Sequence, residues 1–143
     1  MKKLLLIALC ALSLSACADN KQVITFDQLP TTAQTMLSQY VDVKTILIVT
    51  KENFGPFADY EVLTNDRSEW DFDADGSLES VKMYTGVPDA LVPEVIRTQV
   101  NQMYPNTVIT KYSIDKRDQE VELINGIELT FDKAGRLLEA DID

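Results

Sequence analysis

WDFDADGSL, the sequence of residues 70–78, is echoed by LTFDKAGRL at residues 129–137. In both stretches Phe-Asp begins four positions before a Gly, and a Leu follows two positions after that Gly. A β-branched or aromatic run, a short polar turn ending in Gly and a second apolar run are typical of a β-hairpin. The echo therefore predicts one small structural unit that is written twice along the chain.

Each hairpin is preceded by the pattern of an amphipathic helix. The two helices are expected at about residues 30–40 and 93–104, because apolar residues there recur at helical spacing. Pro30 and Pro93 stand at the two starts, where the missing N–H of proline costs no helical hydrogen bond.

Apolar and acidic residues alternate in the predicted strands, as expected for an antiparallel sheet with one buried face. One helix per unit can cover only one face of the sheet. The sequence therefore predicts an α+β fold, in which two tandem helix-plus-antiparallel-sheet repeats (26–84 and 85–143) form one sheet with the helices on one face. The residues expected to face the helices are Val62, Trp70, Phe72, Val121, Leu123, Ile127, Leu129 and Phe131.

The opposite face of the predicted sheet is open and acidic. Like charges that lie directly opposite one another in a sheet are destabilising. Six acids on one face therefore indicate either a well-solvated surface, which is the favoured interpretation, or a positively charged ligand. The candidate binding residues on this face are Glu61, Glu69, Asp71, Glu120, Glu122 and Glu128.

Residues 53–57 contain two aromatic side chains, Phe54 and Phe57, around a Gly-Pro turn signal. The two rings either cap the edge of the core or form an exposed tip that binds a partner. The core interpretation is favoured because apolar loop residues commonly pack under the loop. The first repeat is about four residues longer than the second, and this segment is the expected place for the insertion.

Asp71, Asp73, Asp75 and Gly76 imitate the start of an EF-hand calcium loop. The twelfth position of such a loop should be a bidentate Glu, but it is Lys82 in this chain. The flanking segments are also predicted strands rather than helices. The motif therefore predicts a solvated hairpin, and no metal site is expected.

The N-terminal residues 1–16 have a basic start and then an apolar run that is too short to span a bilayer as a helix. LSAC at residues 14–17 resembles the bacterial lipobox, in which the Cys is lipidated and the chain is cut before it. We therefore expect a signal peptide at 1–16, lipidation at Cys17 and a lipid anchor with a short tether at 17–25. The expected location is the cell envelope, with a lipid anchor at the outer membrane, on either its periplasmic side or the cell surface, and no transmembrane span is expected in the mature chain.

Composition excludes several classes of function. The chain has 13 basic and 23 acidic residues, a formal charge of −10, so nucleic acid is not an expected partner. It contains no His, which excludes Ser-His-Asp and Cys-His catalysis. Cys10 would be removed and Cys17 consumed as the anchor, so the mature chain would have no thiol. A carboxylate-pair enzyme is disfavoured because no acid has an apolar setting; we expect no enzyme and no cofactor.

The repeated order of Leu-Pro or Val-Pro, a helix ending in Tyr, Tyr-Glu-Val or Glu-Val-Glu, and Phe-Asp-x-x-Gly-x-Leu resembles the PepSY-like family of secreted bacterial proteins. This family is also described as β-lactamase-inhibitor-like. The resemblance covers both repeats and implies an α+β fold and a protein-binding role in the cell envelope, with peptidase or β-lactamase inhibition suggested for relatives. We therefore expect a non-enzymatic envelope lipoprotein that binds an unknown envelope protein. The alternative is a binder or sensor of cations or cationic peptides through the acidic face.

Overall fold

The computed structural model describes residues 20–54 and 56–142, which form one nine-stranded antiparallel sheet. The strands lie side by side in chain order, so each strand pairs with the next one along the sequence. The strands are β1 (Lys21–Ile24), β2 (Ile46–Phe54), β3 (Phe57–Thr64), β4 (Glu69–Phe72), β5 (Leu78–Lys82), β6 (Ile109–Ile114), β7 (Asp118–Leu123), β8 (Ile127–Asp132) and β9 (Leu137–Ile142). The predicted signal peptide and the lipidation site Cys17 lie outside the described residues.

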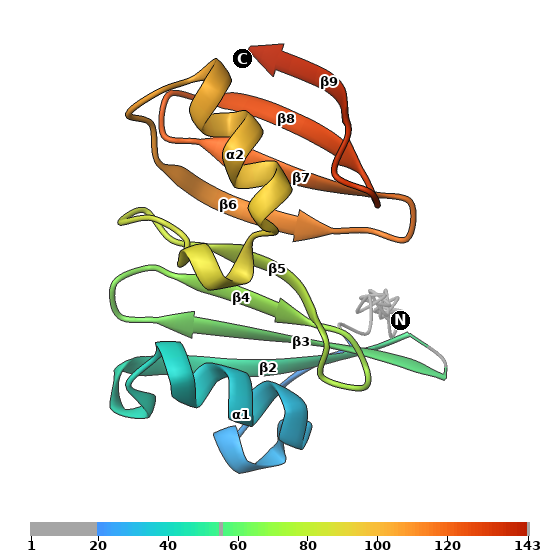
Figure 1. The fold of residues 1–143 in the computed structure, drawn as a ribbon. Helices are drawn as coiled ribbons and strands as arrows, with labels where there is room; N and C mark the ends of the chain where they lie inside the picture. The colour runs from blue at the N-terminus through green and yellow to red at the C-terminus, as the bar shows by residue number, and fades with distance from the viewer. Residues whose placement is uncertain (1–19, 55, 143) are drawn as a thin grey trace, which may run out of the picture.

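The two α-helices of the described residues are α1 (Thr31–Tyr40) and α2 (Glu94–Met103), and both lie on the same side of the sheet (Figure 1). Each begins directly after the predicted proline. Short 3-10 turns are η1 (Phe26–Gln28), η2 (Val43–Thr45) and η3 (Asp89–Leu91). Neither α-helix in the part of the chain described has the length and apolar character of a membrane span.

The core lies between the helices and one face of the sheet. Ala33 and Leu37 of α1 and Ile96 and Val100 of α2 are buried, at the helical spacing that an amphipathic stripe requires. All eight residues predicted to face the helices are buried as well. These buried residues form one cluster that runs through both repeats, so the predicted α+β arrangement is confirmed.

The register shows which positions of the two repeats are equivalent. Tyr60 pairs with Phe72 in the first repeat, and Gln119 pairs with Phe131 in the second. Counting outward from these pairs, β2 to β5 correspond to β6 to β9. In particular, Val81 of β5 corresponds to Ala140 of β9.

A β-bulge occurs at the same place in both repeats. Phe72 lies opposite Leu78, but Asp71 lies opposite Ser80, so Glu79 is the extra residue of β5. In the second repeat the register shifts in the same way, and Leu138 is the extra residue of β9. The bulge moves the rest of each strand by one position relative to a simple alternation.

The two repeats join through β5 and β6. Ser80, Val81 and Lys82 pair with Ser113, Tyr112 and Lys111, respectively. Val81 and Tyr112 are both buried on the helix side of this joint. The sheet and its core therefore continue from one repeat into the other.

Two local expectations were wrong. Residues 21–24, assigned to the tether, form strand β1 and pair with β2. Residues 53–57 are not an ordinary loop that tucks under the core, because β2 runs to Phe54 and β3 begins at Phe57. The side chains of Phe54 and Phe57 are 50% and 68% exposed. They are exposed because β4 pairs with β3 only from Tyr60 onward, so the end of the β2–β3 hairpin extends past the neighbouring strand.

Candidate functional site

The structure places the six predicted acids on the sheet face opposite the buried residues. Glu61 lies opposite Asp71, and Glu122 lies opposite Glu128. Glu69 lies between Leu63 and Lys82, and Glu120 lies between Ser113 and Thr130. We call this surface the open face, because both α-helices of the described residues lie on the other side of the sheet (Figure 1).

The open face is not uniformly acidic, which the sequence reasoning missed. Lys82 and Lys111 lie opposite each other at the joint between the repeats. Lys111 Nζ lies 3.9 Å from Glu120 Oε1, and Lys21 Nζ lies 2.5 Å from Glu61 Oε2. Lys111 could have been placed on this face from the alternation of its strand, whereas Lys82 follows the bulge of β5 and Lys21 lies in a segment that was not predicted to be a strand. The open face therefore has a basic centre between two acidic halves.

The acidic half in the first repeat contains a hollow of about 260 Å³. Its lining includes the ion pair of Lys21 with Glu61, and Thr50, which is only 8% exposed. Thr50 Oγ1 is buried and has no hydrogen-bond partner among the described residues. The complete lining is Lys21, Thr50, Glu52, Asp59, Tyr60, Glu61, Asp71, Glu79 and Ser80.

Two carboxyl groups in this hollow are destabilised as anions. Burial raises the pKa of Asp71, and the charges of Glu61 and Glu69 act in the same direction; a hydrogen bond with Ser80 opposes them. Burial also raises the pKa of Glu79, and four neighbouring aspartates, led by Asp59, raise it further. A cation entering the hollow would relieve this repulsion.

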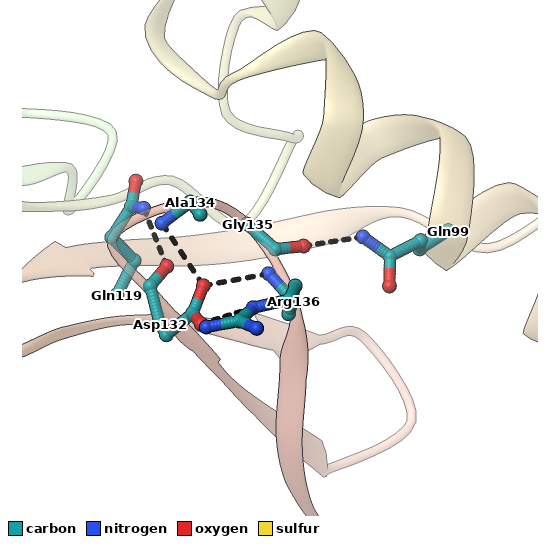
Figure 2. A network of polar contacts seen from close by, with 6 residues as sticks. All are labelled: Gln99, Gln119, Asp132, Ala134, Gly135 and Arg136. Atoms are coloured by element: carbon teal, nitrogen blue, oxygen red, sulfur yellow. Dashed lines mark hydrogen bonds and ion pairs between the residues drawn. The ribbon is translucent and has the colours of Figure 1, made fainter.

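The Phe-Asp-x-x-Gly turn of the second repeat is closed by its aspartate (Figure 2). Asp132 Oδ1 accepts hydrogen bonds from the backbone N–H groups of Ala134 and Arg136, both at 2.9 Å. Asp132 Oδ2 accepts one from Arg136 Nε at 2.7 Å. The hydrogen bond from the backbone of Arg136 is the main cause that lowers the pKa of Asp132, and the guanidinium adds to it.

The turn of the first repeat has the same backbone bonds and a different charge. Asp73 Oδ1 accepts from the N–H groups of Asp75 and Ser77, at 3.1 and 2.9 Å. Asp75 and Ser77 stand where the second repeat has Ala134 and Arg136. Burial and the adjacent Asp75 carboxyl raise the pKa of Asp73, whereas hydrogen bonds with Asp73 and Ser77 lower the pKa of Asp75.

The glycines of both turns lie against a helix. Gly76 and Gly135 have φ of +86° and +82°, a region that favours glycine. A Cβ on Gly76 would lie 2.7 Å from Pro30 Cβ and 3.0 Å from the backbone N of Ala33. A Cβ on Gly135 would lie 2.4 Å from Val95 Cγ1. The motif that the repeats share is therefore a structural clamp that holds each hairpin against the start of its helix.

The family description "Putative beta-lactamase-inhibitor-like, PepSY-like" matches the chain twice, over residues 17–79 and 58–139. The chain belongs to the PepSY-like family. The double match agrees with the two tandem repeats of the structure. No curated protein matches the chain.

Three solved structures similar to this PepSY-like chain come from Bacteroides. One, from Bacteroides vulgatus, is described as a putative periplasmic protein of the DUF2874 family; it is 31% identical, with a TM-score of 0.82. Another, from Bacteroides thetaiotaomicron, is described as a putative calcium-regulated periplasmic protein, also 31% identical, with a TM-score of 0.80. Both alignments cover 87% of this chain and 98% of the other. A second B. vulgatus protein, 21% identical with a TM-score of 0.78, shares the fold.

The calcium-loop imitation does not gather a metal site in the described part of this PepSY-like chain. Across residues 20–54 and 56–142, no group of three or more His, Cys, Asp or Glu side chains is arranged to hold a metal ion. Asp73 and Asp75 instead accept hydrogen bonds within their own turn. Asp71, the second-last residue of β4, lies on the open face.

Proposed function

We propose that this chain is a non-enzymatic cell-envelope lipoprotein whose open face binds a protein partner. The observation that carries the proposal is the uncovered sheet face, because both helices of the described residues lie on the opposite side. This face is formed by a nine-stranded sheet, and its side chains are charged in blocks. Such a surface suits electrostatic recognition of a folded partner more than catalysis.

The charge pattern selects the kind of partner. The acidic block of the second repeat contains Glu120, Glu122 and Glu128 on adjacent strands, and Lys111 stands at its border. A partner surface with a basic patch beside an acidic one would match these blocks. The family description is inhibitor-like, so inhibition of a partner enzyme, such as the peptidase-inhibitor-like role that the resemblance implies, is one form of this proposal.

Site-specific photo-crosslinking tests the proposal. A photoreactive amino acid at Glu120 or Glu122 should crosslink a partner in envelope extract of the source bacterium, whereas the same group at Gln39 or Thr98, exposed on the helix side, should not. Charge reversal of Glu61 and Glu128 should reduce the crosslinking at Glu120 by about tenfold, because complementary charges govern specificity and encounter. Equal crosslinking from the helix-side positions would overturn the proposal.

Lipid anchoring through Cys17 is part of the proposal. The periplasmic descriptions of the similar structures support a location in the cell envelope, and the LSAC sequence supports attachment to a membrane. Replacing Cys17 by Ala should move the protein from the membrane fraction to the soluble fraction, since attachment depends on its acyl chains. Fractionation followed by immunoblotting checks this result. Persistent attachment of the Cys17→Ala variant would contradict the anchor.

Cation binding in the hollow of the first repeat is the second candidate function. Burial raises the pKa values of Asp71 and Glu79 and neighbouring carboxylates raise them further, which favours this function, and one similar protein is described as calcium-regulated. Calcium at 100 times its Kd should raise the free energy of unfolding by about 2.7 kcal/mol. The double variant Asp71→Asn and Glu79→Gln should lose that increase. Magnesium is the control ion for the same measurement. An unchanged melting temperature in millimolar calcium would reject this function.

A further inference from the structure

The outer edge of β9 is available for strand pairing. β9 pairs with β8 on one side, and no other strand of residues 20–54 and 56–142 pairs with its second side. All six residues of β9 are exposed, and Ile142 is 78% exposed. An exposed edge presents backbone N–H and C=O groups that can add a further strand.

The first repeat shows what covers the equivalent edge. β5 corresponds to β9, and its outer edge is covered by β6. Met83, next to the end of β5, donates its N–H to the carbonyl oxygen of Thr110 at 2.8 Å. Val81 is fully buried where Tyr112 lies opposite it, whereas Ala140, the equivalent of Val81, is exposed. The outer edge of β9 is therefore equivalent to the edge of β5 that β6 covers, but no strand of the described residues covers it.

β9 is more acidic than β5 at the equivalent positions. Ser80 and Lys82 of β5 correspond to Glu139 and Asp141 of β9, which lie beside Thr130 and Glu128 on the open face. An added strand would place alternate side chains directly beside these two acids. Basic residues at those positions would be stabilising, and apolar residues between them would lie beside Ala140 and Ile142.

A second copy of the chain fits this edge poorly. Pairing β9 with β9 of another copy would bring Glu139 and Asp141 close to the same acids of that copy. Like charges across strands are destabilising, and charged edges are a common protection against self-association. Charge complementarity therefore favours a different protein.

We propose that the outer edge of β9 binds an extended segment of a partner protein, in which basic side chains alternate with apolar ones. The segment adds a tenth strand to the sheet, with its basic residues on the open face beside Glu139 and Asp141. Its apolar residues lie on the helix side, as Tyr112 does over Val81. The pairing is made by the backbone of this edge, and it does not depend on the function proposed for the open face.

A peptide copied from β6 tests the proposal. The probe is residues 107–115 with Ser113→Lys and a fluorescent label, since Lys111 and position 113 would then lie beside Asp141 and Glu139. Fluorescence anisotropy should show saturable binding to the protein. Hydrogen exchange at the amides of Ala140 and Ile142 should slow in the complex. The matched control peptide carries Glu at both Lys positions and should not bind.

N-methylation distinguishes strand pairing from simple charge attraction. Only one set of alternate peptide amides can face β9, so methylating that set should abolish binding and methylating the other set should not. Equal binding of the two methylated peptides would overturn the proposal.

Protein variants locate the site. Glu139→Lys and Asp141→Lys should each weaken binding about three- to tenfold, whereas Glu94→Lys, an exposed acid of α2, should leave it unchanged. Ala140→Pro should weaken binding strongly, because it removes a donor on the outer edge. Equal affinity for the Glu139, Asp141 and Glu94 variants would overturn the proposal. Sedimentation velocity of the protein alone gives a second test. Self-association that Glu139→Lys alters would also overturn the proposal, since that result would assign the edge to a second copy.

Discussion

The turns at Asp73 and Asp132 have the same backbone hydrogen bonds, but the pKa of Asp73 is raised and that of Asp132 is lowered. Each aspartate accepts two backbone hydrogen bonds in its own turn, and each turn ends in a glycine that lies against a helix. In the second repeat Arg136 neutralises Asp132, whereas in the first repeat Asp75 stands beside Asp73 without an equivalent arginine in the turn. The comparison teaches that the duplicated motif preserves a fold, while its charged positions are free to diverge toward separate functions.

The largest expected effect tests whether the repeats share one core. Phe72 and Phe131 are equivalent and fully buried, so Phe72→Ala and Phe131→Ala should each reduce the free energy of unfolding by about 3–5 kcal/mol. Because one sheet and one core cluster span both repeats, each variant should still unfold in a single transition. Urea denaturation followed by circular dichroism checks both statements. Two separate transitions would show that the repeats are independent domains.

Substitution of a clamp glycine should have the next largest effect on the free energy of unfolding. Gly76→Ala introduces both a strained φ and a contact with the backbone of Ala33, so it should cost about 2–4 kcal/mol. Gly126 also has φ of +86°, but a Cβ there would meet nothing within 4 Å. Gly126→Ala is therefore the matched control and should cost only about 1–2 kcal/mol. Similar melting temperatures for the two variants would mean that the helix contact is unimportant.

The two turn aspartates should differ in the pH dependence of stability. The pKa of Asp132 is lowered, so its contribution is present above the ordinary value of 3.8 and is lost as pH falls through the folded value. Asp132→Asn should therefore destabilise the protein at neutral pH, and the difference should disappear in strong acid. Asp73, whose pKa is raised, should not show this loss. Thermal melts between pH 2 and 7 measure the two curves, and identical curves would reject the distinction.

The smallest effect concerns the open face. Asp71 lies opposite Glu61 and has a raised pKa, so folding favours its protonated form more than the unfolded chain does. This contribution to the free energy of unfolding is present below pH 3.8 and is lost as pH rises through the pKa of the folded protein. Asp71→Asn should therefore raise stability at pH 7 by about 0.5 kcal/mol. Glu120→Gln, which has Thr130 opposite it, is the control and should give no gain. Equal gains for the two variants would argue against repulsion as the cause.

The sequence predicted the buried face well, because alternation along a strand places every second side chain on the same side. Val62, Trp70 and Phe72 in the first repeat and Leu129 and Phe131 in the second are all buried as expected. The starts of α1 and α2, directly after Pro30 and Pro93, could be predicted to within one residue, since proline is common where a helix begins.

The sequence could not predict features that depend on pairing between distant segments. β1 is only four residues long and is a strand because β2 offers an edge to it. The bulges at Glu79 and Leu138 depend on how β5 and β9 pair with their neighbours, and an uninterrupted alternation would place Leu138 on the same side as Ala140. The exposure of Phe54 and Phe57 likewise depends on where β4 stops pairing with β3.

The order of the strands in the sheet has a consequence for folding. Every ladder joins two strands that follow one another in the sequence, so each pairing closes a comparatively short stretch of chain. Folding rates rise as the average sequence separation of contacts falls. The folding chain can therefore assemble progressively from one end, each completed strand pair offering the edge on which the next strand pairs.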